Sequence, residues 1–353
     1  MKDPFLLYGA NGYTGELIAR AAVARGLQPI LAGRNASAIS TLAHELGLEY
    51  RVFPLEDGAA TRAALGMAPL VLHCAGPFAY TAAPMMEACL RMGVHYCDIT
   101  GEIAVFQMLF AYDADARASG VMLLPGVGFD VVPTDCLAAH LKRRLPSANH
   151  LTMAIHGSGS VSHGTALTLL DGVEQESFGM VRRNGRIVPV PLAWRTRQVD
   201  FGRGPQPCIS IPWGDVASAY YSTSIPNIEV YFAIPGWSAL FFNAPRFTSW
   251  LLRRPQLLRY LRRRIEAAAP GPTHEQRTQG TSVIWGRVDD SAGAAAECRL
   301  HTPEAYTLTV LTALAIVEHA LDGKVRSGFQ TPATLLGADF ILDIEGVSRE
   351  DTL

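Results

Sequence analysis

The first residues whose types and spacing could do chemistry are three glycines near the N-terminus. Gly9, Gly12 and Gly15 are spaced as G-x-x-G-x-x-G directly after an apolar run at 5–8. Small residues let the backbone approach the pyrophosphate of a dinucleotide, whose charge the free amides and dipole of a following helix stabilise. We therefore predict a dinucleotide-binding turn that consists of Gly9, Asn11, Gly12, Tyr13, Thr14 and Gly15. Alternatively, three glycines near a turn could only cap the neighbouring elements.

A cation follows the second apolar run, where the chain reads Ala32-Gly33-Arg34-Asn35. At this place an NAD-binding domain commonly carries Asp or Glu, which binds the ribose 2′-hydroxyl. A guanidinium would instead bind a 2′-phosphate, because its planar donor fork matches phosphate geometry. We expect NADP(H) as the cofactor, bound in part by Arg34 and Asn35. The alternative is that Arg34 is only solvated and that Asn35 caps the next helix.

A third turn of mostly small residues follows the apolar run that ends near residue 74. Ligands of parallel α/β sheets bind at the carboxyl edge of the sheet, where this turn would lie. We predict that its backbone lines the ribose and pyrophosphate of the cofactor. The residues concerned are Cys74, Ala75, Gly76, Pro77 and Phe78.

Four polar residues are candidates for the proton transfer that accompanies hydride transfer. Tyr80, Glu102 and Asp130 follow the fourth, fifth and sixth predicted strands, and His163 lies in a Ser-His-Gly-Thr segment further on. Burial would raise the pKa of either carboxyl and allow it to donate a proton. The alternative is that the carboxylates accept backbone hydrogen bonds in tight loops, and that the histidine is structural.

Metal and hydrolase chemistry are disfavoured by the motifs. The six cysteines show neither a C-x-x-C pair nor zinc-like histidine spacing, so no metal is expected. The chain also lacks a G-x-S-x-G nucleophile elbow.

Apolar runs and helical patterns alternate through the first 130 residues and must position these side chains. Strands are predicted at 5–8, 29–32, 50–53, 70–74, 95–99 and 121–124. The alternation predicts a Rossmann-type, doubly wound parallel α/β domain over 1–131. Longer β-like runs predict a second, α+β domain for substrate binding and dimerisation over 132–325, and 326–353 is expected to pack back on the first domain.

Composition limits the partners and the compartment. A chain of 353 residues favours about two domains. The formal net charge of -2 gives no general attraction to nucleic acid, so no nucleic-acid partner is expected. The N-terminus lacks the basic region and cleavage site of a signal peptide. We therefore expect a cytoplasmic protein with reduced cysteines.

Residues 236–264 combine an aromatic, apolar beginning with an arginine-rich end. Pro245 and Arg246 interrupt the apolar part, so a membrane span of about 20 residues is not expected. A basic amphipathic helix here could make a peripheral contact with an anionic membrane or receive an acidic acyl-carrier protein. The alternative is a solvated helix beside a hydrophobic substrate tunnel or a homodimer interface.

Together the motifs resemble those of the saccharopine dehydrogenase-like oxidoreductases, a family that includes the trans-acting enoyl reductases. The matching segments are GANGYTG at 9–15, AGR at 32–34, CAGPF at 74–78, YCDITGE at 96–102 and GFDVVPTD at 128–135. Softer matches are GTA at 164–166 and FQTPATLLG at 329–337. The resemblance implies a Rossmann domain, a second domain that holds the substrate near the nicotinamide, and reduction of a C=N, C=O or C=C bond.

We therefore expect an NADP(H)-dependent oxidoreductase that reduces such a bond in an apolar or acyl-linked small molecule. Saccharopine-type chemistry needs fixed cations for two amino-acid carboxylates, and no motif can be assigned to that task. Abundant apolar and aromatic residues after residue 200 also favour a less polar substrate. Two alternatives stay open: an amino-acid or imine reductase of saccharopine type, and a non-catalytic nucleotide-binding protein associated with a membrane.

Overall fold

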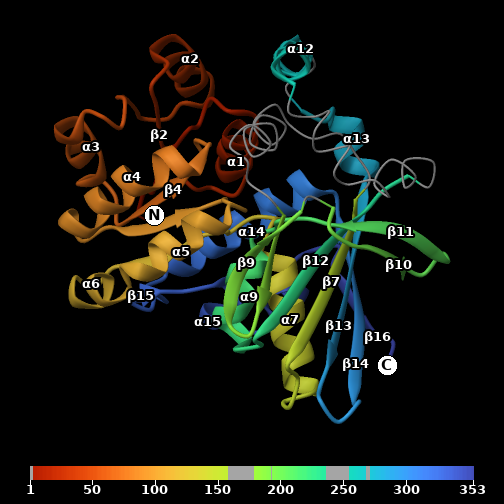
Figure 1. Cartoon of the computed structure of the whole chain (residues 1–353). Coiled ribbons are helices and arrows are strands. Elements are labelled where there is room, and N and C mark those ends of the chain that lie inside the picture. The colour runs from red at the N-terminus through yellow and green to blue at the C-terminus, as the bar shows by residue number, and fades with distance from the viewer. Residues whose placement is uncertain (1–2, 158–178, 192, 236–253, 268–270) are drawn as a thin grey trace. The chain divides into compact units, whose positions relative to one another are not determined.

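The computed structural model of the chain describes residues 3–157, 179–191, 193–235, 254–267 and 271–353 (Figure 1). The chain divides into two compact units. Unit 1 comprises Met1–Val132 and Tyr306–Leu336, and unit 2 comprises Pro133–Ala305 and Gly337–Leu353. None of the helices in these described ranges has both the length and the apolar character needed to cross a membrane.

Unit 1 alternates strands and helices along the chain. Its strands are β1 (Leu6–Tyr8), β2 (Ile30–Gly33), β3 (Tyr50–Val52), β4 (Leu70–His73), β5 (His95–Asp98), β6 (Met122–Leu124) and β15 (Gly328–Phe329). Its helices are α1 (Tyr13–Ala24), α2 (Ala36–Leu46), α3 (Gly58–Leu65), α4 (Phe78–Met92), α5 (Ile103–Ala111), α6 (Asp113–Ala118), α14 (Ala305–Leu321) and α15 (Pro332–Leu336).

The described strands of unit 1 form one parallel sheet in the order β15-β6-β5-β4-β1-β2-β3. Its central strands are apolar on both faces: Leu6, Leu7, Val71 and Leu72 are fully buried. Such continuous apolar runs are typical of parallel strands that are covered on both sides. The Rossmann-type fold class predicted from the sequence is therefore confirmed.

The strand register places the site-bearing loops at one edge of this sheet. Tyr8 is paired with Ala32 on one side and with His73 on the other, and His73 is paired with Asp98. Because the strands are parallel, the loops after β1, β2, β4, β5 and β6 all leave from the carboxyl edge. Ligands of doubly wound sheets bind at this edge.

Unit 2 is built around a mixed sheet. Its strands are β7 (His150–Gly157), β8 (Gly179–Arg183), β9 (Arg186–Val190), β10 (Thr196–Asp200), β11 (Pro205–Ser210), β12 (Asn227–Ala233), β13 (Thr281–Asp289), β14 (Ala295–Pro303) and β16 (Ser348–Asp351). Its helical elements are α7 (Val132–Arg144), α9 (Asp215–Thr223), α12 (Pro255–Ala267), α13 (His274–Gln279) and η2 (Phe340–Asp343). The main path of the sheet runs β10-β11-β12-β7-β13-β14-β16.

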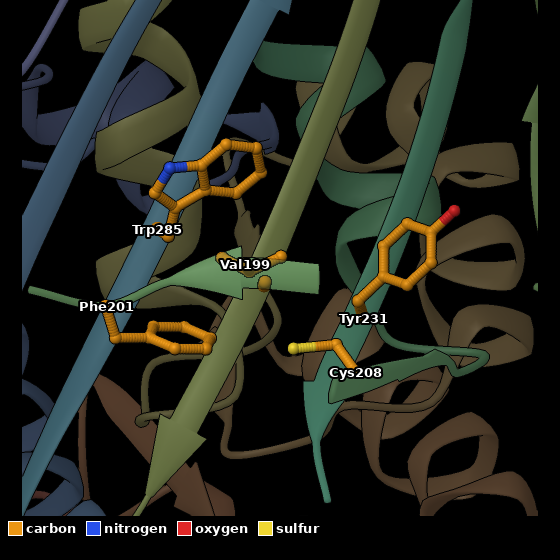
Figure 2. Packing of buried hydrophobic residues seen from close by; sticks show 6 residues of the cluster. Val199, Phe201, Cys208, Tyr231 and Trp285 are labelled. Atoms are coloured by element: carbon orange, nitrogen blue, oxygen red, sulfur yellow. The ribbon is translucent and has the colours of Figure 1, made fainter. Parts of the chain in front are cut away.

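The two faces of the unit 2 sheet are covered differently. On one face, Gly286 of β13 lies close against Leu137 and Leu141 of α7. On the other face, side chains of β7, β12 and β13 pack with those of the β10–β11 hairpin (Figure 2). This cluster consists of Ala154, Val199, Phe201, Cys208, Tyr231 and Trp285. The expected second α+β domain is present in this form.

The C-terminal segments divide between the units in a way that the sequence predicted only in part. The helix α14, assigned from the sequence to the second domain, belongs to unit 1. The strand β15, in the segment expected on the first domain, pairs with β6 of unit 1. Residues 337–353, expected on the first domain, belong to unit 2, because β16 pairs with β14 and Asp339 binds the Arg143 guanidinium at 2.8 Å.

Candidate functional site

The turn after β1 brings the backbone close to neighbouring segments. Gly9 has a positive φ of 83°, and a Cβ there would lie 2.7 Å from the Ala75 amide nitrogen. A Cβ at Gly15 would lie 2.2 Å from the Gly9 carbonyl oxygen, so α1 packs directly on the turn. Side chains larger than hydrogen do not fit at these two positions without a backbone shift.

The start of α1 suits an anionic ligand. Its N-cap residue, Gly12, makes no side-chain cap hydrogen bond. The Gly12 amide donates to the Gly9 carbonyl at 3.0 Å, which shapes the turn, and Tyr13 and Thr14 open the helix half-buried. A helix start without a side-chain cap, next to a close-packed glycine turn, is the arrangement that binds a pyrophosphate. These residues therefore fit a dinucleotide.

Arg34 and Asn35 follow β2 and play different parts. Asn35 is the N-cap of α2, and its side-chain oxygen accepts a hydrogen bond from the Ala38 amide at 3.1 Å. Arg34 is exposed, and within the described ranges its guanidinium makes no hydrogen bond or ion pair. The Asn11 side chain lies beside Gly33, so the glycine turn reaches the end of β2. A 2′-phosphate placed there would meet a cation with unused donors.

The turn after β4 is held from inside the unit. Its Gly76–Pro77 peptide is cis, and Pro77 is the N-cap of α4. The Thr81 hydroxyl donates to the Ala75 carbonyl at 2.7 Å and lies 3.0 Å from Nε2 of His73. Burial raises the pKa of the Cys74 thiol, which favours the protonated form over the nucleophilic thiolate.

His73 was not singled out from the sequence, although it lies under this turn. The ring is fully buried, and burial lowers the pKa of His73 to about 3, so the imidazole is neutral. Nε2 of His73 shares a hydrogen bond with the Thr81 hydroxyl, and the tautomer of the ring sets which of the two is the donor. The signal in the sequence that could have pointed to it is a polar residue at the end of the continuous apolar run 70–72.

Glu102 has a clear structural task. Its two carboxylate oxygens accept the amides of Phe78 and Ala79, each at 2.8 Å. The side chain therefore caps the N-terminus of α4 from a loop 24 residues further along the chain. Tyr80, in the first turn of the same helix, is 64% exposed. In the sequence analysis, accepting backbone hydrogen bonds was the alternative to proton donation for Glu102.

Asp98 ends β5 and ties the neighbouring loops together. Its carboxylate accepts the Thr100 amide at 2.9 Å, the Gly126 amide at 3.0 Å and the Tyr96 hydroxyl at 2.7 Å. Burial raises the pKa of Asp98 to about 6 against the effect of these hydrogen bonds. With all its oxygens engaged, Asp98 organises the site and is poorly placed to exchange protons with a substrate.

Asp130 lies in the loop after β6. Its carboxyl packs against the backbone of the preceding loop, since a Cβ at Gly101 would lie 2.8 Å from Oδ2 of Asp130. Burial raises the pKa of Asp130 to about 7. A carboxyl whose pKa is raised in this way keeps its proton to a higher pH than an ordinary aspartate, which is the property needed in a general acid.

Two expectations concern residues outside unit 1. His163 lies outside the described residues. Among the described residues, His140, Cys298 and Asp351 in unit 2 are close enough to share a metal. However, the Arg143 guanidinium donates to Nδ1 of His140, so the ring proton is on Nε2, which donates to Asp351 at 2.8 Å. A hydrogen-bonded His–Asp pair explains this cluster.

Comparison with known proteins finds a family model that matches most of the first part of unit 1. Residues 5–124 match the model described as the saccharopine dehydrogenase NADP-binding domain. A trans-acting enoyl reductase of Mycobacterium leprae is 32% identical over 148 residues, covering 40% of this chain and 35% of the relative. One of Mycobacterium ulcerans is 26% identical over 270 residues, covering 72% and 61%. The chain thus spans about one third to three fifths of the length of these relatives.

A solved structure shares the fold of the whole chain. Saccharopine dehydrogenase (L-Glu forming) from Saccharomyces cerevisiae superposes with a TM-score of 0.68 over 99% of this chain and 100% of its own, at 11% identity. Identity this low shows the fold alone. Together, these matches confirm the resemblance stated from the motifs.

Proposed function

We propose that this chain, a relative of the saccharopine dehydrogenase-like oxidoreductases, is an NADPH-dependent reductase of a C=C, C=O or C=N bond in an apolar or acyl-linked small molecule. One observation carries the proposal: the carboxyl edge of a single parallel sheet combines an uncapped glycine turn, a cation and a carboxyl with a pKa of about 7. These three parts suit pyrophosphate binding, 2′-phosphate binding and proton donation.

The preference for NADPH over NADH rests on Arg34. The residues at the end of β2 are Gly33, Arg34 and Asn35, and none of them is an acid that would accept the ribose hydroxyls of NADH. Arg34 needs no displacement from an ion pair before it binds a phosphate, because none is formed within the described ranges. The description of the matched family model also names NADP.

Asp130 is the carboxyl best suited to supply the proton. When bound, NADPH provides a hydride, and the reduced acceptor then needs one proton to complete the reaction. Protonated Asp130 gives its carboxyl proton to the acceptor and becomes a carboxylate, which solvent reprotonates. Glu102 is less suited, because both its oxygens are engaged by the α4 amides.

The charge around Asp130 also bears on the substrate. Asp98 ends β5 and Glu102 lies in the loop that follows, at the same edge of the sheet. The negative charge of Glu102 helps to raise the pKa of Asp98. A substrate carboxylate near these groups would be repelled. An uncharged acceptor, such as an enoyl thioester or a ketone, is therefore favoured over the amino-acid substrates of the saccharopine-type alternative. The names of the matched relatives point to the enoyl group.

NADPH oxidation by the full chain tests the proposal. Three acceptor classes are compared: enoyl thioesters, apolar ketones, and an amine with a 2-oxo acid. We expect turnover with one of the first two, and a large loss in Asp130→Asn. Turnover with the amine and oxo acid alone would support the saccharopine-type alternative. NADPH binding without turnover in any class would contradict the reductase and favour the non-catalytic alternative.

The helix α12 supports a peripheral contact with an anionic membrane. Its described side chains divide by character: Leu258 is buried, whereas Arg259, Arg263 and Arg264 are exposed and Tyr260 is 56% exposed. Cationic and aromatic side chains together favour an anionic interface. Salt-sensitive co-sedimentation with anionic vesicles is expected. Binding to an acyl-carrier protein without vesicle binding would reject the membrane in favour of that partner.

A further inference from the structure

The helix α14 belongs to unit 1 although it follows the second unit in the sequence. Its buried side chains, which include Leu308, Leu314 and Ile316, point to more than one side of the helix and anchor it in this unit. Its first two turns lie beside two different loops of the candidate site. Neither contact could be anticipated from the motifs, because more than 170 residues separate α14 from both loops.

The first contact joins α14 to the dinucleotide turn. The ring of Tyr306 meets the ring of Tyr13 edge-on, with 5.1 Å between the ring centroids and 90° between the planes. Edge-to-face pairs at this separation are favourable beyond the area they bury. Tyr13 is the first residue of α1, so its backbone amide belongs to the helix start that would face the pyrophosphate. Tyr306 therefore supports the turn from outside.

The second contact joins α14 to the loop that carries Asp130. The Phe129 amide donates to the Thr309 hydroxyl at 3.0 Å, and the Thr312 hydroxyl donates to the Val127 carbonyl at 2.9 Å. A Cβ at Gly128 would lie 2.9 Å from the Thr309 methyl carbon, so the loop backbone packs tightly on the helix. The residue before Asp130 is thus held by a buried hydrogen bond from α14.

We propose that α14 is the element that positions both halves of the candidate site: Tyr306 positions the phosphate-binding turn, and Thr309 positions the loop of Asp130. Both are positioning residues, since each acts through another residue. The inference rests on the proposed function, because it takes the glycine turn as the pyrophosphate site and Asp130 as the proton donor.

The two contacts predict separable effects. Loss of the Tyr306 ring should weaken NADPH binding by about 2- to 10-fold, the range that an aromatic pair supplies. Loss of the Thr309 hydroxyl should leave NADPH binding almost unchanged. It should instead let water reach the loop and lower the pKa of Asp130 from about 7 toward the usual range of an aspartate.

The test uses four variants of the full chain and one control variant. Tyr306→Ala and Thr309→Val remove the contacts, and Tyr306→Phe and Thr309→Ser keep the ring and the hydroxyl. Glu318→Gln, at the far end of the same helix, is the matched control, since it removes only an ion pair with Arg25 at 3.7 Å. Melting temperature is recorded for each variant.

Two readouts separate positioning from general stability. NADPH fluorescence titration gives the Kd, and carboxyl ¹³C NMR with labelled aspartate gives the pKa of Asp130, whose signal is assigned with Asp130→Asn. We expect Tyr306→Ala to change only the Kd and Thr309→Val only the pKa, with recovery in Tyr306→Phe and Thr309→Ser. The inference would be overturned if the Kd is unchanged in Tyr306→Ala and the pKa is unchanged in Thr309→Val, or if Glu318→Gln changes these quantities by the same amounts.

Failure of this inference is distinguishable from failure of the proposed function. If the unmodified chain does not bind NADPH, the proposed function is wrong. The pKa of Asp130 still reports on Thr309 in that case. The other case is that the unmodified chain binds NADPH, that Tyr306→Ala binds it equally well, and that the pKa of Asp130 is unchanged in Thr309→Val. Only the role of α14 is then wrong.

Discussion

Replacing Glu102 by Gln separates its two possible roles. The carboxylate receives two amide hydrogen bonds at the start of α4, both at 2.8 Å. A glutamine keeps one acceptor oxygen, but its NH₂ group faces the second amide and cannot accept from it. If Glu102 is a cap, Glu102→Gln should destabilise unit 1. If Glu102 is the proton donor, the variant should fold as well as the parent and lose turnover.

The size of the effect follows from the hydrogen bonds. A hydrogen bond to a charged group contributes about 1.5–3 kcal/mol, and the charge near a helix N-terminus adds about 0.3–1 kcal/mol. Glu102 is partly exposed, which reduces both contributions. We therefore expect a loss of about 2 kcal/mol in the free energy of unfolding. For a unit of this size, each kcal/mol lowers the melting temperature by about 2–4 °C.

Thermal unfolding with and without NADPH measures this loss. The matched control is Glu87→Gln on the same helix, whose carboxylate forms only an exposed i,i+4 pair with Arg91 at 3.6 Å. That variant should change the stability by less than about 0.5 kcal/mol. A Glu102→Gln protein as stable as the control, with turnover abolished, would refute the assignment of Glu102 as a cap.

Four further predictions concern the cofactor and the proton. Arg34→Ala should raise the Kd of NADPH by about 10- to 150-fold and leave that of NADH unchanged, because charge-assisted hydrogen bonds of about 1.5–3 kcal/mol are lost. The rate of NADPH oxidation should fall as the pH rises through about 7, where Asp130 loses its proton. Asp130→Asn should abolish this pH dependence and lower the rate by about 10²–10⁴-fold. Gly15→Ala should weaken NADPH binding in fluorescence titrations, because its Cβ would lie 2.2 Å from the Gly9 oxygen; unchanged affinity would contradict the close packing. Thr81→Val should cost about 1–3 kcal/mol in thermal unfolding, since the buried His73 ring and the half-buried Ala75 carbonyl lose their partner, whereas Thr81→Ser should not.

The sequence predicted those parts of the site that depend on local pattern. Gly9 and Gly15 could be identified because a close-packed turn between a strand and a helix requires glycine at fixed spacing. The strands of unit 1 were recognisable from short apolar runs, which parallel strands need when both faces are buried. Arg34 was noticed because it stands where an acid is common.

The parts that the sequence did not predict depend on contacts between distant segments. Glu102 could be a proton donor or a cap until the structure placed its oxygens on the α4 amides. The helix α14 has an apolar pattern that any buried helix would show, and its position beside Tyr13 and Phe129 follows from tertiary packing alone. The same holds for β16, because its pairing with β14 is set between segments about 50 residues apart.

Comparative titration of the unmodified chain with NADPH and NADH tests the central claim most directly. Nicotinamide fluorescence reports binding of both dinucleotides, and the two differ only in the 2′-phosphate that Arg34 would bind. The account predicts that NADPH binds more tightly by at least about 10-fold, in keeping with a phosphate held by a guanidinium. Equal affinities, tighter binding of NADH, or no binding of either dinucleotide would contradict it.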